Sequence, residues 1–202
     1  MALITWISRS TGIKTLRRNS FALRFFLLFP WLIRLTGFAL RTPVLVSALL
    51  VTNISFLVGV VYFHRFARKH LDERGARNAV VVLSYFPTAY LFHVPYSESL
   101  FLCLSVLLFY HADRGNWKWA GIFGAMATAS RVTGLALLPA LAYEYWSKKK
   151  RLDSEINWVG LAGTECLVYL AINYALFQEP FHFIVIQREL WFKSFAFPWV
   201  GI

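Results

Sequence analysis

The 202-residue chain is 58% hydrophobic and 15% charged, whereas a soluble domain carries about 25% charged residues. Its net charge of +11 comes from 21 lysines and arginines against 10 acidic residues, and the basic residues cluster between long apolar runs. This is the positive-inside pattern of a membrane protein, with anionic lipid headgroups as partners, and it argues against nucleic-acid binding. We therefore predict an all-α membrane protein, a polytopic helical bundle with short, broken or re-entrant helices.

The first apolar run covers residues 21–40 and follows a basic N-terminal segment, residues 1–20, which we expect to be retained rather than cleaved as a signal peptide. Arg24, Pro30 and Arg34 interrupt this run. Two interpretations stay open: the run spans the membrane, or it lies in the interface as an aromatic-rich amphipathic helix.

The next three apolar runs differ in length. Residues 43–63 form an uninterrupted span, which a polar and basic segment at 64–78 follows. The runs at 79–92 and 98–110 are short, and a polar break at 93–97 separates them. Helices too short to cross the hydrocarbon core are tolerated where they line a cavity or are buried in protein.

Residues 119–146 are apolar except for Arg131 and Glu144, and the basic cluster Lys148–Arg151 follows them. One straight span here would place that cluster on the outer side, against the positive-inside rule. We therefore predict a helix broken near Arg131–Gly134, with two halves of about 20 Å each at 1.5 Å per residue.

The end of the chain holds a further span at 156–177, with Glu165 inside it, and an aromatic-rich tail. We place the basic loops on the cytoplasmic side, so that the tips of two short hairpins face a common outward cavity. The organisation predicted in this way is a transmembrane helical bundle over residues 21–177 and an outer-side loop at 178–202. The three cytoplasmic loops are residues 64–78, 111–118 and 147–153.

The predicted outer tips carry Glu98 and Arg131, and an ionisable residue at membrane depth suggests function. Glu98 is the candidate catalytic residue, unless it only caps its helix together with Ser97. Arg131 either pairs with a carboxylate, such as Glu98 or Glu165, or binds a phosphate group in bidentate fashion. No spacing of His, Cys or Asp predicts a metal site, and no nucleotide-binding loop occurs, so we expect no metal and no cofactor.

Several runs form a recognisable pattern. Phe86-Pro87-Thr88 precedes Pro95-Tyr96-Ser97-Glu98-Ser99-Leu100-Phe101, and Ala129-Ser130-Arg131-Val132-Thr133-Gly134 follows a Trp-rich charged turn. Together they resemble the GPI mannosyltransferase II (PIG-V) family. The resemblance covers about residues 25 to 202 and includes these further pieces: Phe25–Pro30, Glu179-Pro180-Phe181, Gln187, Trp191 and Pro198-Trp199.

The resemblance implies a C-type glycosyltransferase fold and a multi-pass enzyme of the endoplasmic reticulum or bacterial inner membrane. Such an enzyme transfers a sugar from a polyprenyl-phosphate donor, typically dolichyl-phosphate mannose, to a lipid-linked or glycolipid acceptor, as in GPI anchor biosynthesis. Arg131 would hold the donor phosphate. The residues that would bind the sugar and the acceptor are His93, Tyr96, Ser97, Gln187 and Trp191.

The chain departs from that family in one respect. Its members carry an acidic residue, usually Asp, in the first outer loop, as base for the acceptor hydroxyl. Here the first acidic residue is Asp72, within the predicted cytoplasmic loop. We therefore expect a truncated or diverged chain, and an inactive fragment is one interpretation. The alternatives are a non-catalytic membrane partner subunit and a small transporter-like bundle with Glu98, Arg131 and Glu165 along a polar path.

Overall fold

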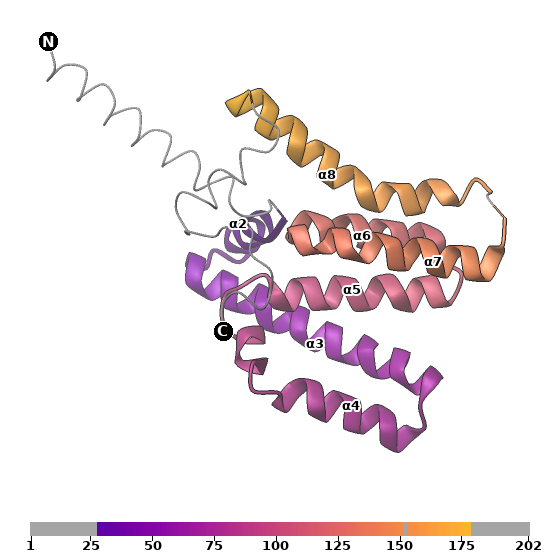
Figure 1. Ribbon diagram of the computed structural model, residues 1–202. Helices are drawn as coiled ribbons and strands as arrows, with labels where there is room; N and C mark the ends of the chain where they lie inside the picture. Colours follow the sequence, from indigo (N-terminus) through magenta and orange to yellow (C-terminus); the bar gives the residue numbers. More distant parts are fainter. Residues whose placement is uncertain (1–27, 152, 179–202) are drawn as a thin grey trace, which may run out of the picture. The chain divides into compact units, whose positions relative to one another are not determined.

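A computed structural model of the chain describes residues 28–151 and 153–178, which contain α-helices and short 3-10 helices but no strand (Figure 1). The chain divides into two compact units, and α2 to α7 with the first half of α8 lie in the unit of residues 25–166. The helices are α2 (Leu28–Leu40), α3 (Val44–His70), α4 (Glu73–Tyr85), η1 (Ala89–Phe92), α5 (Glu98–Asp113), α6 (Trp117–Ser130), η2 (Val132–Ala136), α7 (Leu137–Lys149) and α8 (Ile156–Phe177).

The all-helical prediction is confirmed, and so is the break in the long apolar run at 119–146. α6 ends at Ser130, and α7 begins only at Leu137. Among the described helices, α3 is the one that combines the length and the apolar character of a complete membrane span. Its 27 residues extend about 40 Å at 1.5 Å per residue.

The prediction of a polar loop over residues 64–78 is wrong in its extent, because most of this segment is helical. α3 continues to His70, and α4 starts at Glu73. The basic last turn of α3 suits the negative end of the helix dipole. Asp72 caps α4, since its Oδ1 accepts a hydrogen bond from the Gly75 amide at 3.0 Å. The apolar run ends at residue 63, so there is no apolar signal for helix beyond it. Capping by Asp72 and the favourable interaction of basic residues with the helix dipole stabilise helical structure in this polar segment.

Small residues bring α6 against the first half of α8. A Cβ atom at Gly121 would lie 2.1 Å from the Trp158 carbonyl oxygen, so the two backbones are in direct contact. One helical turn later, a Cβ atom at Gly124 would lie 2.7 Å from the Ala162 Cβ. Thr128 then donates a hydrogen bond to the Ala162 carbonyl at 2.9 Å. Contact through small residues and a hydroxyl is typical of helix packing in membranes.

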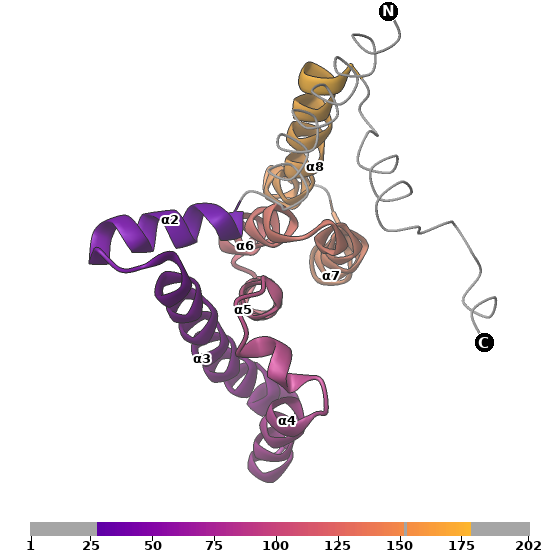
Figure 2. The same ribbon diagram turned by 90° about the vertical axis from the view of Figure 1, so that its left-hand side faces the viewer.

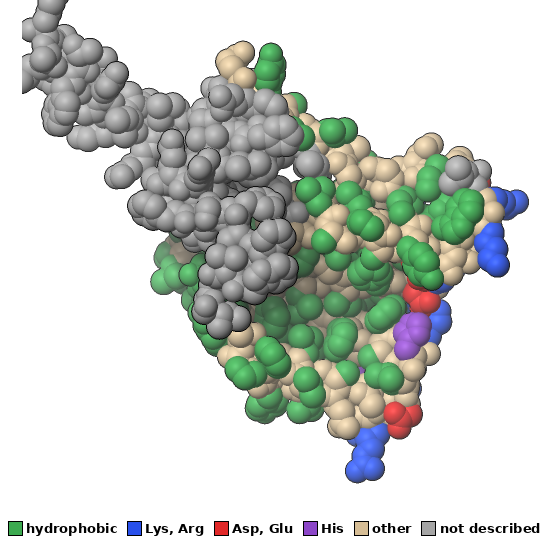
Figure 3. Space-filling view, viewed as in Figure 1, with side chains coloured by type: hydrophobic (Ala, Val, Ile, Leu, Met, Phe, Trp, Pro, Cys, Tyr) green, Lys and Arg blue, Asp and Glu red, His purple; other side chains and the backbone are tan. Residues whose placement is uncertain are grey.

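The links between helices lie at two ends of the unit of residues 25–166 (Figure 1). The links α3–α4, α5–α6 and α7–α8 lie together at one end, called here the basic end. The loop after α4 and the α6–α7 break lie at the other, called here the tip end. In Figure 3 the coloured charged side chains gather along the edge that holds the basic end, and hydrophobic side chains cover much of the face beside it.

Ion pairs connect the helices at the basic end. Asp113, at the end of α5, binds Lys69 of α3 at 2.6 Å and Lys148 of α7 at 3.0 Å. In the loop after α7, Asp153 binds Lys149 at 2.9 Å and accepts a hydrogen bond from the Tyr145 hydroxyl at 2.5 Å. The Lys149 and Tyr145 bonds lower the pKa of Asp153 to about 2. The three predicted cytoplasmic loops therefore lie at one end of the unit.

Helix α2 takes a different direction from its neighbours. It is seen end-on in Figure 1 and lengthwise in Figure 2, whereas α5, α6 and α7 show the opposite, so α2 crosses them at a large angle. Phe29 is buried against Leu100 and Ala127, while Trp31 and Phe38 are exposed. These features favour the interfacial interpretation of the first apolar run.

Candidate functional site

Arg131 lies at the apex of a tight reversal between α6 and η2. Its own backbone is extended, with φ −156° and ψ 144°, and Gly134 donates a hydrogen bond to the Arg131 carbonyl at 2.9 Å. The reversal folds η2 back so closely that a Cβ atom at Gly134 would lie 2.7 Å from the Thr128 Cα and 2.8 Å from the Thr128 nitrogen. A residue without a side chain is therefore required at position 134, and this close turn holds Arg131 at the tip end.

Glu98 opens α5 at the same end of the unit. Ser97 occupies the N-cap position, but its side chain makes no capping hydrogen bond. The buried Ser99 hydroxyl donates instead to the Phe92 carbonyl at 2.6 Å, which ties the end of η1 to the first turn of α5. Ser97 therefore occupies the predicted N-cap position without making the capping hydrogen bond. Glu98 lies in the first turn of α5, and its carboxylate contacts another partner.

That partner is Arg131, whose Nη1 forms an ion pair with Glu98 Oε1. The Arg131 side chain is 34% exposed and the Glu98 side chain 26%, so the pair lies half-buried at the protein surface. Glu98 Oε2 is buried, with no hydrogen-bond partner among the described residues. Of the two interpretations of Arg131, the structure shows the pairing with Glu98. The side chain of Glu165, the other partner considered, lies outside the described part.

The pair leaves hydrogen-bonding capacity on both residues. A guanidinium carries five N–H groups, and this contact involves the Nη1 nitrogen alone. Oε2 likewise keeps its lone pairs, and a buried acceptor without a donor costs free energy that a ligand group would recover. Arg131 therefore keeps N–H groups that could bind an anionic group, whereas Glu98 Oε2 is buried and would meet a hydroxyl donor only once the pair opens.

His93 faces α3 rather than the ion pair. Its Nδ1 lies 3.0 Å from Asn53 Oδ1, and its ring centroid is 5.0 Å from that of Phe56. Phe56 also stacks on Phe92 at 5.3 Å. Asn53 and Phe56 were not among the predicted site residues. The available signal was Asn53 itself, an amide within an apolar span.

The other predicted substrate-binding residues differ in where they lie and in whether the structure describes them. Tyr96 is exposed, and Ser97 is half-buried, in the loop that leads into α5. Gln187 and Trp191 lie outside the described residues. Asp72, the first acidic residue of the chain, caps α4 at the basic end, away from the ion pair. In the described residues, no three His, Cys, Asp or Glu side chains are grouped as metal ligands would be.

An all-helical, largely apolar fold with a charged pair between short helices is that of a membrane protein with a polar site. Residues 27–179, well over half of the chain, match the sequence model of the dolichyl-phosphate-mannose-protein mannosyltransferase family, and the chain belongs to this family. The match includes both Glu98 and Arg131. Comparisons with curated proteins and with solved structures gave no match.

Family membership confirms the broader part of the functional prediction, a membrane glycosyltransferase of the mannosyltransferase type. The family is membrane-embedded and implies a polyprenyl-phosphate sugar donor with a lipid or protein acceptor. The matched family is not specifically that of GPI mannosyltransferase II, which the sequence motifs resemble.

Proposed function

We propose that this chain transfers mannose from a polyprenyl-phosphate donor, such as dolichyl-phosphate mannose, to a lipid-linked or glycolipid acceptor. The observation that carries the proposal is the Arg131–Glu98 pair at the tip end, inside the region that matches the mannosyltransferase family. A donor that arrives through the bilayer needs a cation at membrane depth and no nucleotide-binding loop. Arg131 is such a cation.

The proposed reaction begins when the donor phosphate binds the Arg131 guanidinium, which phosphate oxygens match in bidentate fashion. The phosphate then competes with Glu98 for Arg131 and leaves the carboxylate available as a general base. As the acceptor oxygen attacks C1 of the sugar, Glu98 accepts the hydroxyl proton. The bond between C1 and the phosphate oxygen breaks, and polyprenyl phosphate leaves with the electron pair.

The loop before α5 and the tail would seat the substrates. His93, Tyr96 and Ser97 present polar and aromatic groups in that loop, and aromatic faces beside polar groups suit sugar rings. Gln187 and Trp191 of the tail would complete the site. The resemblance to GPI mannosyltransferase II supports a GPI-type glycolipid acceptor and the endoplasmic reticulum. A bacterial inner membrane is the alternative location.

One observation favours a second candidate, a partner subunit that binds the lipid-linked sugar without transferring it. Asp72 is already used in capping α4 at the basic end, and Glu98 is held by Arg131. Among the described side chains, Glu98 is then the one carboxylate at the tip end. If this one described carboxylate stays paired with Arg131, the chain would bind the donor and leave catalysis to another subunit.

The two candidates are separated by transfer of labelled mannose from polyprenyl-phosphate mannose, in membranes that contain only this chain. Transfer above background, lost in Glu98→Gln, is the expected result, because the amide cannot accept the hydroxyl proton. A matched control is Glu73→Gln, which removes a carboxylate at the basic end. Absence of transfer with donor binding retained would replace the enzyme by the partner subunit.

We further propose a multi-pass topology with the basic end in the cytoplasm. A single cysteine at Arg151 (Arg151→Cys) is expected to react with a membrane-impermeant maleimide only after permeabilisation, since basic loops are retained inside. A cysteine at the exposed Thr133 (Thr133→Cys), at the tip end, is expected to react in sealed cells or vesicles of matching orientation. The reverse labelling pattern would overturn this topology.

A further inference from the structure

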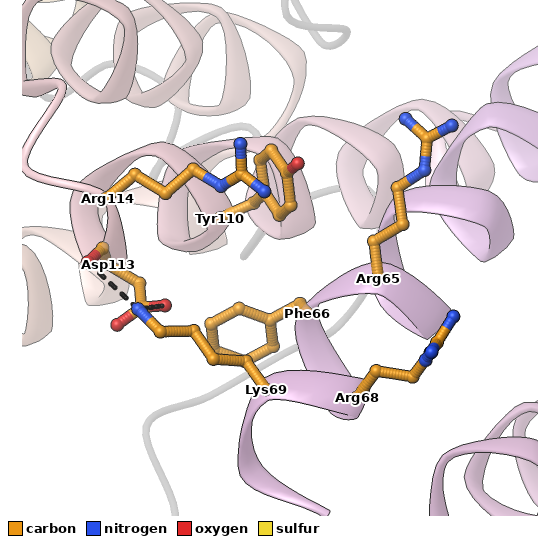
Figure 4. Close-up of a pocket in the computed structure, with 7 residues that line it drawn as sticks. All are labelled: Arg65, Phe66, Arg68, Lys69, Tyr110, Asp113 and Arg114. Carbon is orange, nitrogen blue, oxygen red and sulfur yellow. Dashed lines mark hydrogen bonds and ion pairs between the residues drawn. The ribbon is translucent and has the colours of Figure 1, made fainter. Parts of the chain in front are cut away.

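A pocket of about 530 Å³ lies at the basic end, between the last turns of α3 and α5 (Figure 4). Arg65, Arg68 and Lys69 of α3, with Arg114 just after α5, supply four cations, and Asp113 supplies one carboxylate. The pocket lies at the opposite end of the unit from the Arg131–Glu98 pair. The mannosyl transfer proposed above does not use it.

The carboxylate in this pocket is already neutralised. Asp113 binds Lys69 at 2.6 Å, as the dashed line in Figure 4 shows, and it also binds Lys148 at 3.0 Å. Arg68 binds Glu73 at 2.8 Å. Arg65 and Arg114 have no carboxylate within ion-pair distance among the described residues. The pocket therefore has a net positive charge and two guanidinium groups available for an anion.

Two tyrosine rings hold these guanidinium groups in place. The Arg114 guanidinium lies 4.4 Å from the centre of the Tyr110 ring, and that of Arg65 lies 5.3 Å from the Tyr62 ring. The two tyrosines contact each other edge to face, with centroids 5.1 Å apart. Stacking restricts the side-chain freedom that an arginine would otherwise lose on binding. The cations are thus positioned before any anion arrives.

The pocket is placed where the apolar part of α3 ends. The uninterrupted apolar run ends at residue 63, and Arg65 is the first arginine after it. Along the preceding turns of α3, Leu57 and Val61 are exposed apolar side chains. Phosphate groups of a bilayer lie at this boundary, and acyl chains would follow those exposed residues. A phosphate attached to acyl chains therefore fits the surroundings better than a free phosphate ion does.

From these observations we propose that the α3–α5 pocket binds the phosphate group of an anionic membrane phospholipid, with Arg65 and Arg114 as its principal ligands. Arginine-lined pockets at helix ends are suited to such headgroups, because the guanidinium fork matches two phosphate oxygens. This lipid would be held at one place on the protein, in contrast to the diffuse attraction that all basic loops have for an anionic surface.

The test uses the purified full-length chain in neutral detergent, titrated with phosphatidylglycerol. Retained lipid is measured by native mass spectrometry, and the melting temperature is measured in parallel. The double variant Arg65→Gln/Arg114→Gln is expected to bind phosphatidylglycerol roughly 30-fold more weakly. The control Arg74→Gln/Arg151→Gln removes the same charge from exposed positions outside the pocket, and it is expected to bind as the unmodified chain does.

Each other outcome would overturn the proposal. Equal losses in the two double variants would mean diffuse attraction without a site. Unchanged binding in the pocket variant would remove Arg65 and Arg114 as ligands. Inorganic phosphate that competes as strongly as the lipid would identify a soluble anion instead. Should the double variant fail to fold, Arg65→Gln alone gives the same comparison against Arg74→Gln, with an expected loss of about fivefold.

Discussion

Replacement of Arg131 by alanine is expected to weaken binding of polyprenyl-phosphate mannose by about 30-fold, because loss of the guanidinium from the pair it would form with the bound donor phosphate costs about 2 kcal/mol. The guanidinium supplies the only cation that the described structure places beside Glu98. Donor binding to the purified protein in detergent measures the effect. The melting temperature should fall little, because a half-exposed ion pair contributes up to about 1 kcal/mol to stability.

Two further variants make this experiment specific. Arg131→Lys keeps the charge but loses the planar fork, so donor affinity should lie between those of the unmodified chain and Arg131→Ala. Arg151→Ala removes one positive charge at the basic end and should leave donor affinity unchanged. A folded Arg131→Ala chain with unchanged donor affinity would show that the pair with Glu98 is structural and nothing more.

Gly134→Ala is expected to destabilise the fold by about 3 kcal/mol, the upper part of the range for inserting atoms into a packed site. The new methyl group would lie 2.7 Å from the Thr128 Cα and 2.9 Å from the Ala127 carbonyl carbon. These are backbone atoms of α6, which cannot rotate away as a flexible side chain does. The reversal that positions Arg131 would have to open, so donor binding should decrease together with stability.

Thermal unfolding in detergent measures the cost, with Gly160→Ala as the matched control. A Cβ atom at Gly160 has no neighbour within 4 Å, so that variant is expected to be neutral or slightly stabilising, since alanine favours the helix. Equal melting temperatures for Gly134→Ala and Gly160→Ala would contradict the close approach of η2 to α6.

The sequence was most informative where the length of an apolar run and the charge of the segment after it favoured different topologies. A run of 119–146 is long enough to cross a membrane, but the cluster after it would then lie on the wrong side. That conflict predicted the break near Arg131, which the structure confirms. Glu98 and Glu165 could be named as candidate partners of Arg131, because few acidic residues lie inside apolar runs.

Other contacts could not be predicted, because they join residues far apart in the chain. Asn53 and His93 are separated by 40 residues, and the contact depends on how η1 packs on α3. The triad of Lys69, Asp113 and Lys148 likewise depends on three helices ending at one level. Periodicity describes one helix at a time and contains no information on how the ends of separate helices align. The direction of α2 could not be predicted from the sequence for the same reason.

The Arg131–Glu98 pair also bears on how the protein enters its membrane during synthesis. In the proposed topology, α5 and α6 form a hairpin with a short link at the cytoplasmic end, so both charges must be carried through the hydrocarbon layer. Each charge alone would oppose insertion, and neither helix reaches the usual length for independent partitioning. A hairpin inserted as one unit can carry the two opposite charges as a neutral pair. The residues proposed for catalysis would then also assist biogenesis, and Glu98→Gln, by leaving Arg131 uncompensated, would reduce the yield of inserted protein.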